Sequence, residues 1–200
     1  MMKKLRKIPS ILFTWTFVQM FRWLYYDSQY LKGHWFKKIN SEGWKWAAND
    51  ILHRMLFQTN KSVKWPVSPY SSYGNNILFD VDDLNNFMGT GNYFQTLNAH
   101  IVIGKGTRIA RNVGIITTNH NIYNLDKHQE GKAVVLGQSC WIGMNSVILP
   151  GVILGDHTIV GAGAVVTHSY PDGNCIIAGN PAKLIKRLDG EMIEKECLDY

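Results

Sequence analysis

Histidine and cysteine side chains are the groups of this sequence that could carry chemistry. The cysteines are odd in number and lack metal-type spacing, so they predict neither a zinc site nor a disulfide framework: Cys140, Cys175 and Cys197. A zinc site of three histidines would need two of them close in sequence, and His100, His120 and His128 do not provide that pair. A single histidine can instead act as a general base, because its pKa lies near neutrality. We therefore predict no bound metal.

Aliphatic residues recur at every sixth position in the C-terminal half of the chain. They are Leu136, Ile142, Ile148, Leu154, Val160 and Val166. The position two residues earlier is mostly small or β-branched, and the position after is most often glycine. An α-helix has a period of about 3.6 and a half-buried strand a period of about 2, so a period of six indicates a short strand and a turn. Such repeats are typical of a parallel β-helix, whose aliphatic side chains stack inside the coils.

A polar stretch interrupts these repeats. Upstream, Ile103, Ile109 and Ile115 follow the same pattern, but the interval from Ile115 to Leu136 is not a multiple of six. We therefore expect residues 117–132 to leave the coil as an inserted loop, and such loops usually gather on a functional face.

The two ends of the repeat region are less regular. Strands are predicted at residues 63–65, 77–79 and 93–95, between turn-rich segments. After the last repeat, residues 182–188 are predicted to form a short basic helix that closes the open end of the solenoid.

The N-terminal segment, residues 1–60, differs from the rest of the chain in charge and aromatic content. It holds ten Lys or Arg against three acidic residues, a net charge of +7, whereas residues 61–200 hold eleven against twelve, a net charge of −1. Thirteen of the 24 aromatic residues also lie there, a combination favoured at membrane–water interfaces rather than on DNA. In the apolar run from Ile8 to Tyr26, a helix would carry Thr16, Gln19 and Arg22 as a narrow polar stripe. Membrane contact and burial against protein both stay open.

A cytoplasmic location is expected. Met1–Lys7 and the apolar run after it look like a signal peptide, but no small-x-small cleavage site follows. The cysteine content fits a reducing compartment. A peripheral position on the inner face of the membrane, through residues 1–60, is compatible with this location.

Four motifs closely resemble those of the hexapeptide-repeat acetyltransferases. They are Cys140–Asn145, Ile148–Gly151, Val160–Thr167 and Ala178–Ala182, within a match over residues 90–188. The resemblance implies a left-handed β-helix, a homotrimer, and acetyl-coenzyme A in the groove between subunits. The handedness comes from the resemblance alone, since general crossover rules favour the right-handed form.

The expected fold is therefore mainly β, a left-handed parallel β-helix with a helical extension at its N-terminus and a short C-terminal helix. The extension covers residues 1–60, and the catalytic β-helix covers residues 61–182 with the inserted loop at 117–132. The C-terminal helix and tail cover residues 183–200.

The resemblance also implies roles for individual residues. In the family a histidine in or beside the inserted loop is the general base, and Thr117–Asn121 stands at that place, so His120 is the expected catalytic residue. Its task would be to take the proton of a hydroxyl that attacks a thioester. Positions that match the cofactor groove are Trp141, Gly143, Met144, Gly161, Ala162, Thr167, Gly179, Lys183 and Lys186. Expected acceptor contacts are Gln95, Asn98, Asn119 and His128.

Other roles are open for several of these residues. The glycines also serve turns, Trp141 could lie in a trimer interface, and the lysines could be solvated. Cys140 could suggest an acyl-cysteine, but it occupies a small inward position of its repeat, where a thiol fills the core. We do not expect it to act as a nucleophile.

The function predicted from these features is acetyl-coenzyme A-dependent O-acetylation of a sugar hydroxyl, in the synthesis or modification of surface polysaccharide. An N-acetyltransferase of an amino sugar or antibiotic is the alternative, because a histidine base serves amines equally well. Zinc carbonic anhydrases use the same solenoid, but the histidine spacing fails. A non-catalytic β-helix scaffold would leave the His120 loop and the Ala178–Ala182 terminus unexplained.

Overall fold

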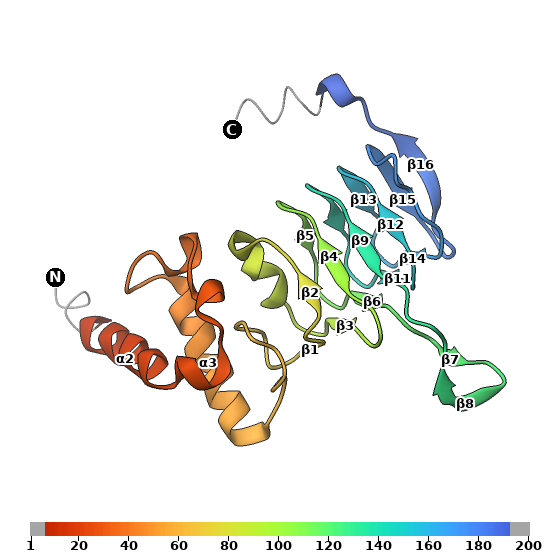
Figure 1. The fold of residues 1–200 in the computed structure, drawn as a ribbon. Helices are drawn as coiled ribbons and strands as arrows, with labels where there is room; N and C mark the ends of the chain where they lie inside the picture. Colours follow the sequence, from red (N-terminus) through yellow and green to blue (C-terminus); the bar gives the residue numbers. More distant parts are fainter. Residues whose placement is uncertain (1–6, 193–200) are drawn as a thin grey trace.

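The computed structural model describes residues 7–192, and its main body is a solenoid of short strands stacked in three sheets (Figure 1). The first sheet contains β1 (Ser72–Tyr73), β3 (Tyr93–Gln95), β6 (Gly114–Ile116), β11 (Val147–Ile148) and β14 (Val165–Val166). The second contains β5 (Arg108–Ile109), β10 (Trp141–Ile142), β13 (Thr158–Val160), β15 (Cys175–Ala178) and β16 (Lys183–Arg187). The third contains β2 (Ile77–Leu78), β4 (Ile101–Ile103), β9 (Val134–Leu136) and β12 (Ile153–Leu154). All pairings within these sheets are parallel except that of β15 with β16. The predicted mainly β fold is confirmed.

The six-residue pattern produces the core of the solenoid. Successive strands belong to the third, second and first sheets in turn, so each side chain at the aliphatic position stacks on its equivalent in the next coil. All six of the predicted aliphatic positions are at most 1% exposed: Leu136, Ile142, Ile148, Leu154, Val160 and Val166. The small residues two positions earlier, from Val134 to Ala164, are buried as well. The side chains at this position must be small because the equivalent residues of the coils above and below pack closely against them.

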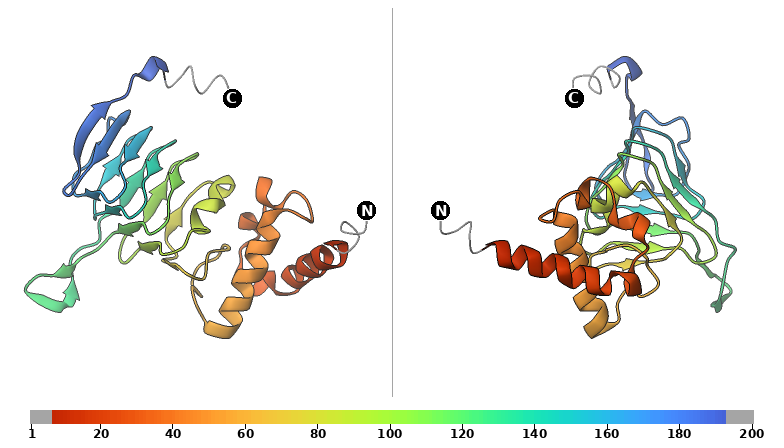
Figure 2. Two further views of the ribbon diagram at one scale, coloured as in Figure 1. Left: turned by 180° about the vertical axis from the view of Figure 1, so that it is seen from behind. Right: turned by 60° about the vertical axis from the view of Figure 1, so that its left-hand side comes forward.

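The chain leaves the solenoid once, between β6 and β9. Stacked partners in regular coils are separated by three repeats, as in Ile142 and Val160, whereas a much longer stretch of chain separates the stacked pair Ile109 and Ile142. The additional stretch contains a β-hairpin of β7 (His120–Asn121) and β8 (Asn124–His128). The hairpin projects sideways, clear of the coils, in Figure 1 and in the left view of Figure 2.

A helical unit covers the N-terminal end of the solenoid (Figure 2). It consists of α2 (Lys7–Tyr25), the short 3-10 helices η1 (Ser28–Leu31) and η2 (His34–Phe36), and α3 (Glu42–Phe57). A third 3-10 helix, η3 (Val81–Phe87), occupies the place of a second-sheet strand in the first coil. Its side chains replace the missing ladder: the Asn86 Oδ1 accepts from the Ile109 backbone N at 2.9 Å, and the Asp83 Oδ2 from the Gly106 N at 2.7 Å.

A buried ion pair within α3 anchors the helical unit to the segment that leads into the solenoid. The Arg54 guanidinium contacts the Asp50 carboxylate at 2.8 Å, and both side chains are fully buried. Arg54 also donates to the backbone oxygens of Val63, at 2.6 Å, and Trp65, at 2.9 Å. These contacts explain why residues 63–65, predicted as a strand, are not one, since an arginine takes the carbonyls that a neighbouring strand would use. The sequence analysis also missed the strand β1.

The predicted C-terminal helix is wrong for residues 183–187. This segment is β16, an antiparallel strand on β15. The last coil would otherwise end in an open strand edge with unpaired backbone groups, and the returning chain pairs with that edge. A helical turn begins only at residue 190, and the rest of the predicted tail, with Cys197, lies outside the described residues.

Candidate active site

The predicted base, His120, lies on β7 where the hairpin leaves the solenoid. Its Nδ1 is 2.8 Å from the Leu125 backbone oxygen, a contact in which Nδ1–H must be the donor because a carbonyl only accepts. A neutral ring in this arrangement carries its lone pair on Nε2, which is the atom that a general base needs. The side chain is exposed in the single chain. The local turn of the hairpin therefore fixes both the tautomer and the orientation of the ring.

His128 is the cross-strand partner of His120. The two rings lie 4.5 Å apart between centroids, with planes tilted by 34°. The ring of His128 is thus a direct neighbour of His120, and its predicted contact with the acceptor stays a prediction.

The neck of the hairpin is held by Gln95, the last residue of β3. Its Oε1 accepts from the backbone N of Thr117, at 3.1 Å, and of Thr118, at 3.0 Å, and its Nε2 donates to the Thr118 oxygen at 3.1 Å. Both threonine hydroxyls donate to the Leu97 backbone oxygen. In the single chain the Gln95 amide is thus occupied by the backbone just before His120.

The other two predicted acceptor residues also lie at the neck. Asn98 is exposed in the turn between β3 and β4, at φ 58°, and it lies directly against Gly131 on the returning limb of the insertion. Asn119 is exposed, and its backbone oxygen accepts from the Gln129 N at 2.8 Å. The structure therefore brings Gln95, Asn98 and Asn119 to the base of the hairpin that carries His120.

The predicted cofactor residues Trp141 and Lys186 share one row across the second sheet. Backbone pairing aligns Trp141 with Ile159, Ile159 with Ile176, and Ile176 with Lys186. The next residues, Ile142, Val160 and Ile177, are buried, so this row faces outward, and Trp141 is 58% exposed. Ile159 and Ile176 were missed by the sequence analysis, and the three-repeat stacking interval would have found Ile159. The outward-facing apolar side chains of this row suit the extended part of a ligand. The lysine at the end of the row suits a phosphate group of the same ligand.

The predicted glycines line one corner of the solenoid. Gly143, Gly161 and Gly179 follow β10, β13 and β15, so they stack where the chain turns from the second sheet to the first. A Cβ on Gly143 would lie 2.6 Å from the Val160 oxygen, which requires glycine there for packing alone. Beside this corner, Met144 and Ala162 are exposed and occupy equivalent positions in successive coils.

The remaining cofactor candidates lie elsewhere. Thr167 follows β14, on the corner from which the hairpin leaves, and its hydroxyl is 2.7 Å from the His168 Nδ1. Lys183 is exposed on β16, paired with Ala178 beside Gly179.

The environment of Cys140 does not favour thiol chemistry. Cys140 is 1% exposed, and burial raises the pKa of its thiol, which disfavours the thiolate that a nucleophile needs. Between residues 7 and 192 no three His, Cys, Asp or Glu side chains gather as a set of metal ligands.

Comparison with known proteins agrees with the repeat pattern. Residues 133–168 match the model of the bacterial transferase hexapeptide (six repeats) family. Galactoside O-acetyltransferase of Escherichia coli is 33% identical over 144 residues, which is 70% of this chain and 68% of that protein. WbbJ of E. coli, assigned provisionally as an O-acetyl transferase of lipopolysaccharide biosynthesis, is 40% identical over 106 residues. This match covers 46% of the chain and only 52% of WbbJ.

The fold comparison includes a solved structure of the N-acyltransferase AntD from Bacillus cereus, in complex with dTDP-4-amino-4,6-dideoxyglucose and coenzyme A. It has a TM-score of 0.50 and 18% identity over 68% of this chain and 76% of that chain. At this identity the likeness shows the fold alone.

Proposed function

The chain is an acetyltransferase of the hexapeptide-repeat family, and from that premise we propose that it transfers the acetyl group of acetyl-coenzyme A to a hydroxyl of a saccharide. The observation that carries the proposal is His120, whose Nδ1–H donates to the Leu125 oxygen and leaves Nε2 as the proton acceptor. The named activity of the galactoside relative supports a sugar acceptor, and that of WbbJ supports a role in surface polysaccharide.

In the proposed reaction acetyl-coenzyme A supplies the activated acyl group. His120 Nε2 takes the proton of the attacking hydroxyl as its oxygen bonds to the carbonyl carbon. The carbon–sulfur bond then breaks, and the thiolate of coenzyme A leaves with the proton. The products are an acetyl ester and a free thiol. Gln95, Asn98, Asn119 and His128 are proposed to lie beside the acceptor or to hold the hairpin that faces it.

We propose that the coenzyme lies along the outward row from Trp141 to Lys186 and the adjacent corner. The apolar face of that row and the exposed Lys183 and Lys186 support this placement. Gly143, Met144, Gly161, Ala162 and Gly179 would flank it. Thr167 lies on the hairpin corner, across the first sheet from this row.

A homotrimer of left-handed β-helices is the proposed assembly. The hairpin projects away from the coils of its own chain (Figure 2), and its tip carries exposed apolar side chains, with Tyr123 92% and Ile122 72% exposed. A neighbouring copy would cover this tip and bring His120 to a cofactor row. The catalytic unit of residues 61–182 and a cytoplasmic location, peripheral at the inner membrane face, complete the proposal.

Release of free thiol from acetyl-coenzyme A, with a panel of galactosides, nucleotide sugars and amino sugars, tests the function. His120→Ala should abolish the acceptor-dependent release. His34→Ala is the matched control, because His34 is also exposed and its Nδ1 is also bonded, to Asp82 at 2.9 Å. An alkali-stable product would indicate an amide, and thus the N-acetyltransferase alternative. Failure to bind acetyl-coenzyme A would favour the scaffold.

A further inference from the structure

Helix α2 presents an apolar face to the outside of the helical unit. Its large exposed side chains recur along the whole helix: Leu12 (52% exposed), Phe13 (71%), Met20 (65%), Trp23 (74%) and Leu24 (49%). A surface helix normally carries polar residues on this side. A polar stripe was expected at Thr16, Gln19 and Arg22, but Gln19 is half-buried. The stripe therefore does not make the outer face polar.

The polar atoms on this face do not depend on water. The Thr16 hydroxyl donates to the backbone oxygens of Leu12 and Phe13, both at 2.9 Å. The Trp23 Nε1 donates to the Met20 oxygen at 2.8 Å. Within the helix the backbone groups are paired by helical hydrogen bonds. The face can therefore enter an apolar medium without leaving these side-chain donors unpaired.

The opposite face of α2 is already covered by protein. Val18 is fully buried, Ile11 and Tyr25 on the same side are half-buried, and α3 is the main packing partner of the helix. A second apolar side is thus not needed for the fold. It requires a separate partner.

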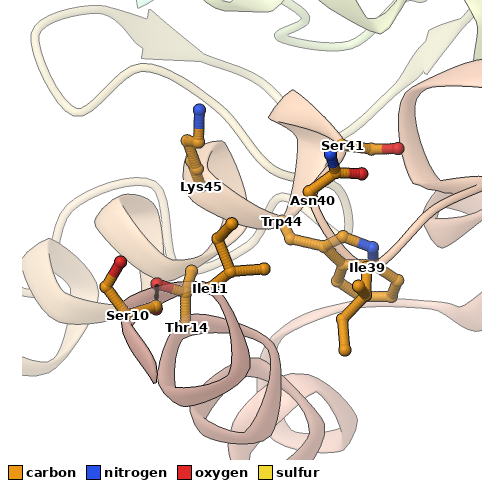
Figure 3. A pocket seen from close by; sticks show the side chains of 8 residues that line it. All are labelled: Ser10, Ile11, Thr14, Ile39, Asn40, Ser41, Trp44 and Lys45. Carbon is orange, nitrogen blue, oxygen red and sulfur yellow. Dashed lines mark hydrogen bonds between the residues drawn. The ribbon is translucent and has the colours of Figure 1, made fainter. Parts of the chain in front are cut away.

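An apolar pocket opens beside this face. It has a volume of about 110 Å³ and lies between Ile11 and Thr14 of α2 and the segment of residues 39–45 (Figure 3). Ile39 and Trp44 line it, and Lys45 stands at the same pocket. An adjoining groove is lined by Ile11, Leu12 and Ile39, so Leu12 belongs both to the groove and to the outer face.

The charge around this surface favours one kind of partner. Helix α2 contains no acidic residue in its sequence, and in the whole helical unit the exposed basic residues Arg22, Lys32, Lys37 and Lys38 outnumber the exposed acidic residues Asp27 and Glu42. A second copy meeting this face through a two-fold contact would bring like charges together. An anionic lipid surface attracts the same residues, and tryptophan is favoured at the boundary between acyl chains and headgroups.

We infer that the outer face of α2 lies on an anionic lipid bilayer, with the side chains from Leu12 to Leu24 among the acyl chains and the basic residues at the headgroups. The groove beside Ile11, Leu12 and Ile39 would take part of one acyl chain. Docking of this kind does not depend on acetyl transfer.

Sedimentation of the full chain with vesicles tests the inference. Wild-type protein should pellet with phosphatidylcholine vesicles that contain about one third phosphatidylglycerol, less with phosphatidylcholine alone, and less at high salt. The variant Phe13→Gln/Met20→Gln/Trp23→Gln should stay in the supernatant. These side chains are at least 65% exposed, so the fold should tolerate their loss.

The matched control is Leu78→Gln/Ile185→Gln/Met192→Gln, which removes apolar side chains of 56–65% exposure from other parts of the chain. It should pellet like the wild type. The inference is wrong if the wild type fails to pellet with anionic vesicles, or if the α2 variant pellets equally well. A change of mass of the α2 variant in light scattering, without vesicle binding by the wild type, would instead assign the face to a contact between copies. Thiol release with a water-soluble acceptor is measured in parallel, and its outcome does not bear on docking.

Discussion

The solenoid and the hairpin that leaves it position their side chains by different means. In the solenoid, residues such as Ile142 and Ile148 are fully buried and stacked on equivalent residues of the next coil. In the hairpin, all residues from 122 to 130 are exposed, and the arrangement depends on a few hydrogen bonds at Gln95 and Leu125. The solenoid is thus a closely packed frame, whereas the hairpin holds the ring of His120, the proposed base. Substitutions of buried residues in the solenoid should change stability, and substitutions around His120 in the hairpin should change activity.

The largest loss of stability is expected where the solenoid meets the helical unit. Arg54→Ala leaves the buried Asp50 carboxylate without its partner, which should lower the free energy of unfolding by about 3–5 kcal/mol. Lys45→Ala is the control, because its ion pair with Glu42 is exposed and should contribute about 1 kcal/mol or less. Denaturant unfolding measures both. Equal losses of unfolding free energy in the two variants would show that Arg54 does not make the buried contacts described above.

A smaller loss is expected inside the coils. Ile148→Ala removes a fully buried stacked side chain and should cost about 2–5 kcal/mol of unfolding free energy. Ile153→Ala makes the same chemical change on the outside of β12, where the side chain is 45% exposed, and should cost under about 1 kcal/mol. If thermal unfolding found the order reversed, the inward register of the repeats would be wrong.

The neck should respond in activity more than in stability. Gln95→Leu removes the side-chain hydrogen bonds to Thr117 and Thr118 and should displace His120, lowering kcat about 10- to 100-fold. The KM for acetyl-coenzyme A should stay unchanged, because the proposed coenzyme row lies on another sheet. Gln138→Leu, at an exposed corner, is the control. If the Gln95→Leu variant kept the wild-type kcat in an assay well below its unfolding temperature, that result would contradict the proposed role of the neck.

The smallest effect is expected at His128. His128→Ala removes the ring beside His120 but keeps the bond to the Leu125 oxygen, so kcat should fall less than about 10-fold. Glu130→Ala, at another exposed residue of the insertion and away from its apolar tip, tests whether the effect is specific to the ring contact. A loss as large as that of a catalytic residue would mean that His128 itself acts on the substrate.

The solenoid could be predicted from the sequence because every repeat places an aliphatic residue at the same one of its six positions. An error in assigning the repeats would therefore appear as an interval that is not a multiple of six. The exit of the chain at residue 117 followed from the same period. Pairing that no repeat encodes was not predictable: the aliphatic pattern of Leu184 and Ile185 does not reveal that β16 turns back on an open edge. Nor could the pattern of α2 show which of two apolar sides faces α3. The hydrogen bond from His120 to Leu125 depends on the hairpin register, which polar sequence specifies only weakly.

The central claim is that the solenoid core determines stability while the hairpin carries the proposed catalytic base, and the variant His120→Ala tests it most directly. The measurement is kcat/KM for acetyl transfer to a saccharide together with the midpoint of thermal unfolding, on the same preparations of wild type and variant. The account predicts a fall in kcat/KM of about 10²- to 10⁴-fold with an unchanged unfolding midpoint. Activity near that of the wild type, or a loss of activity only in step with unfolding, would contradict it.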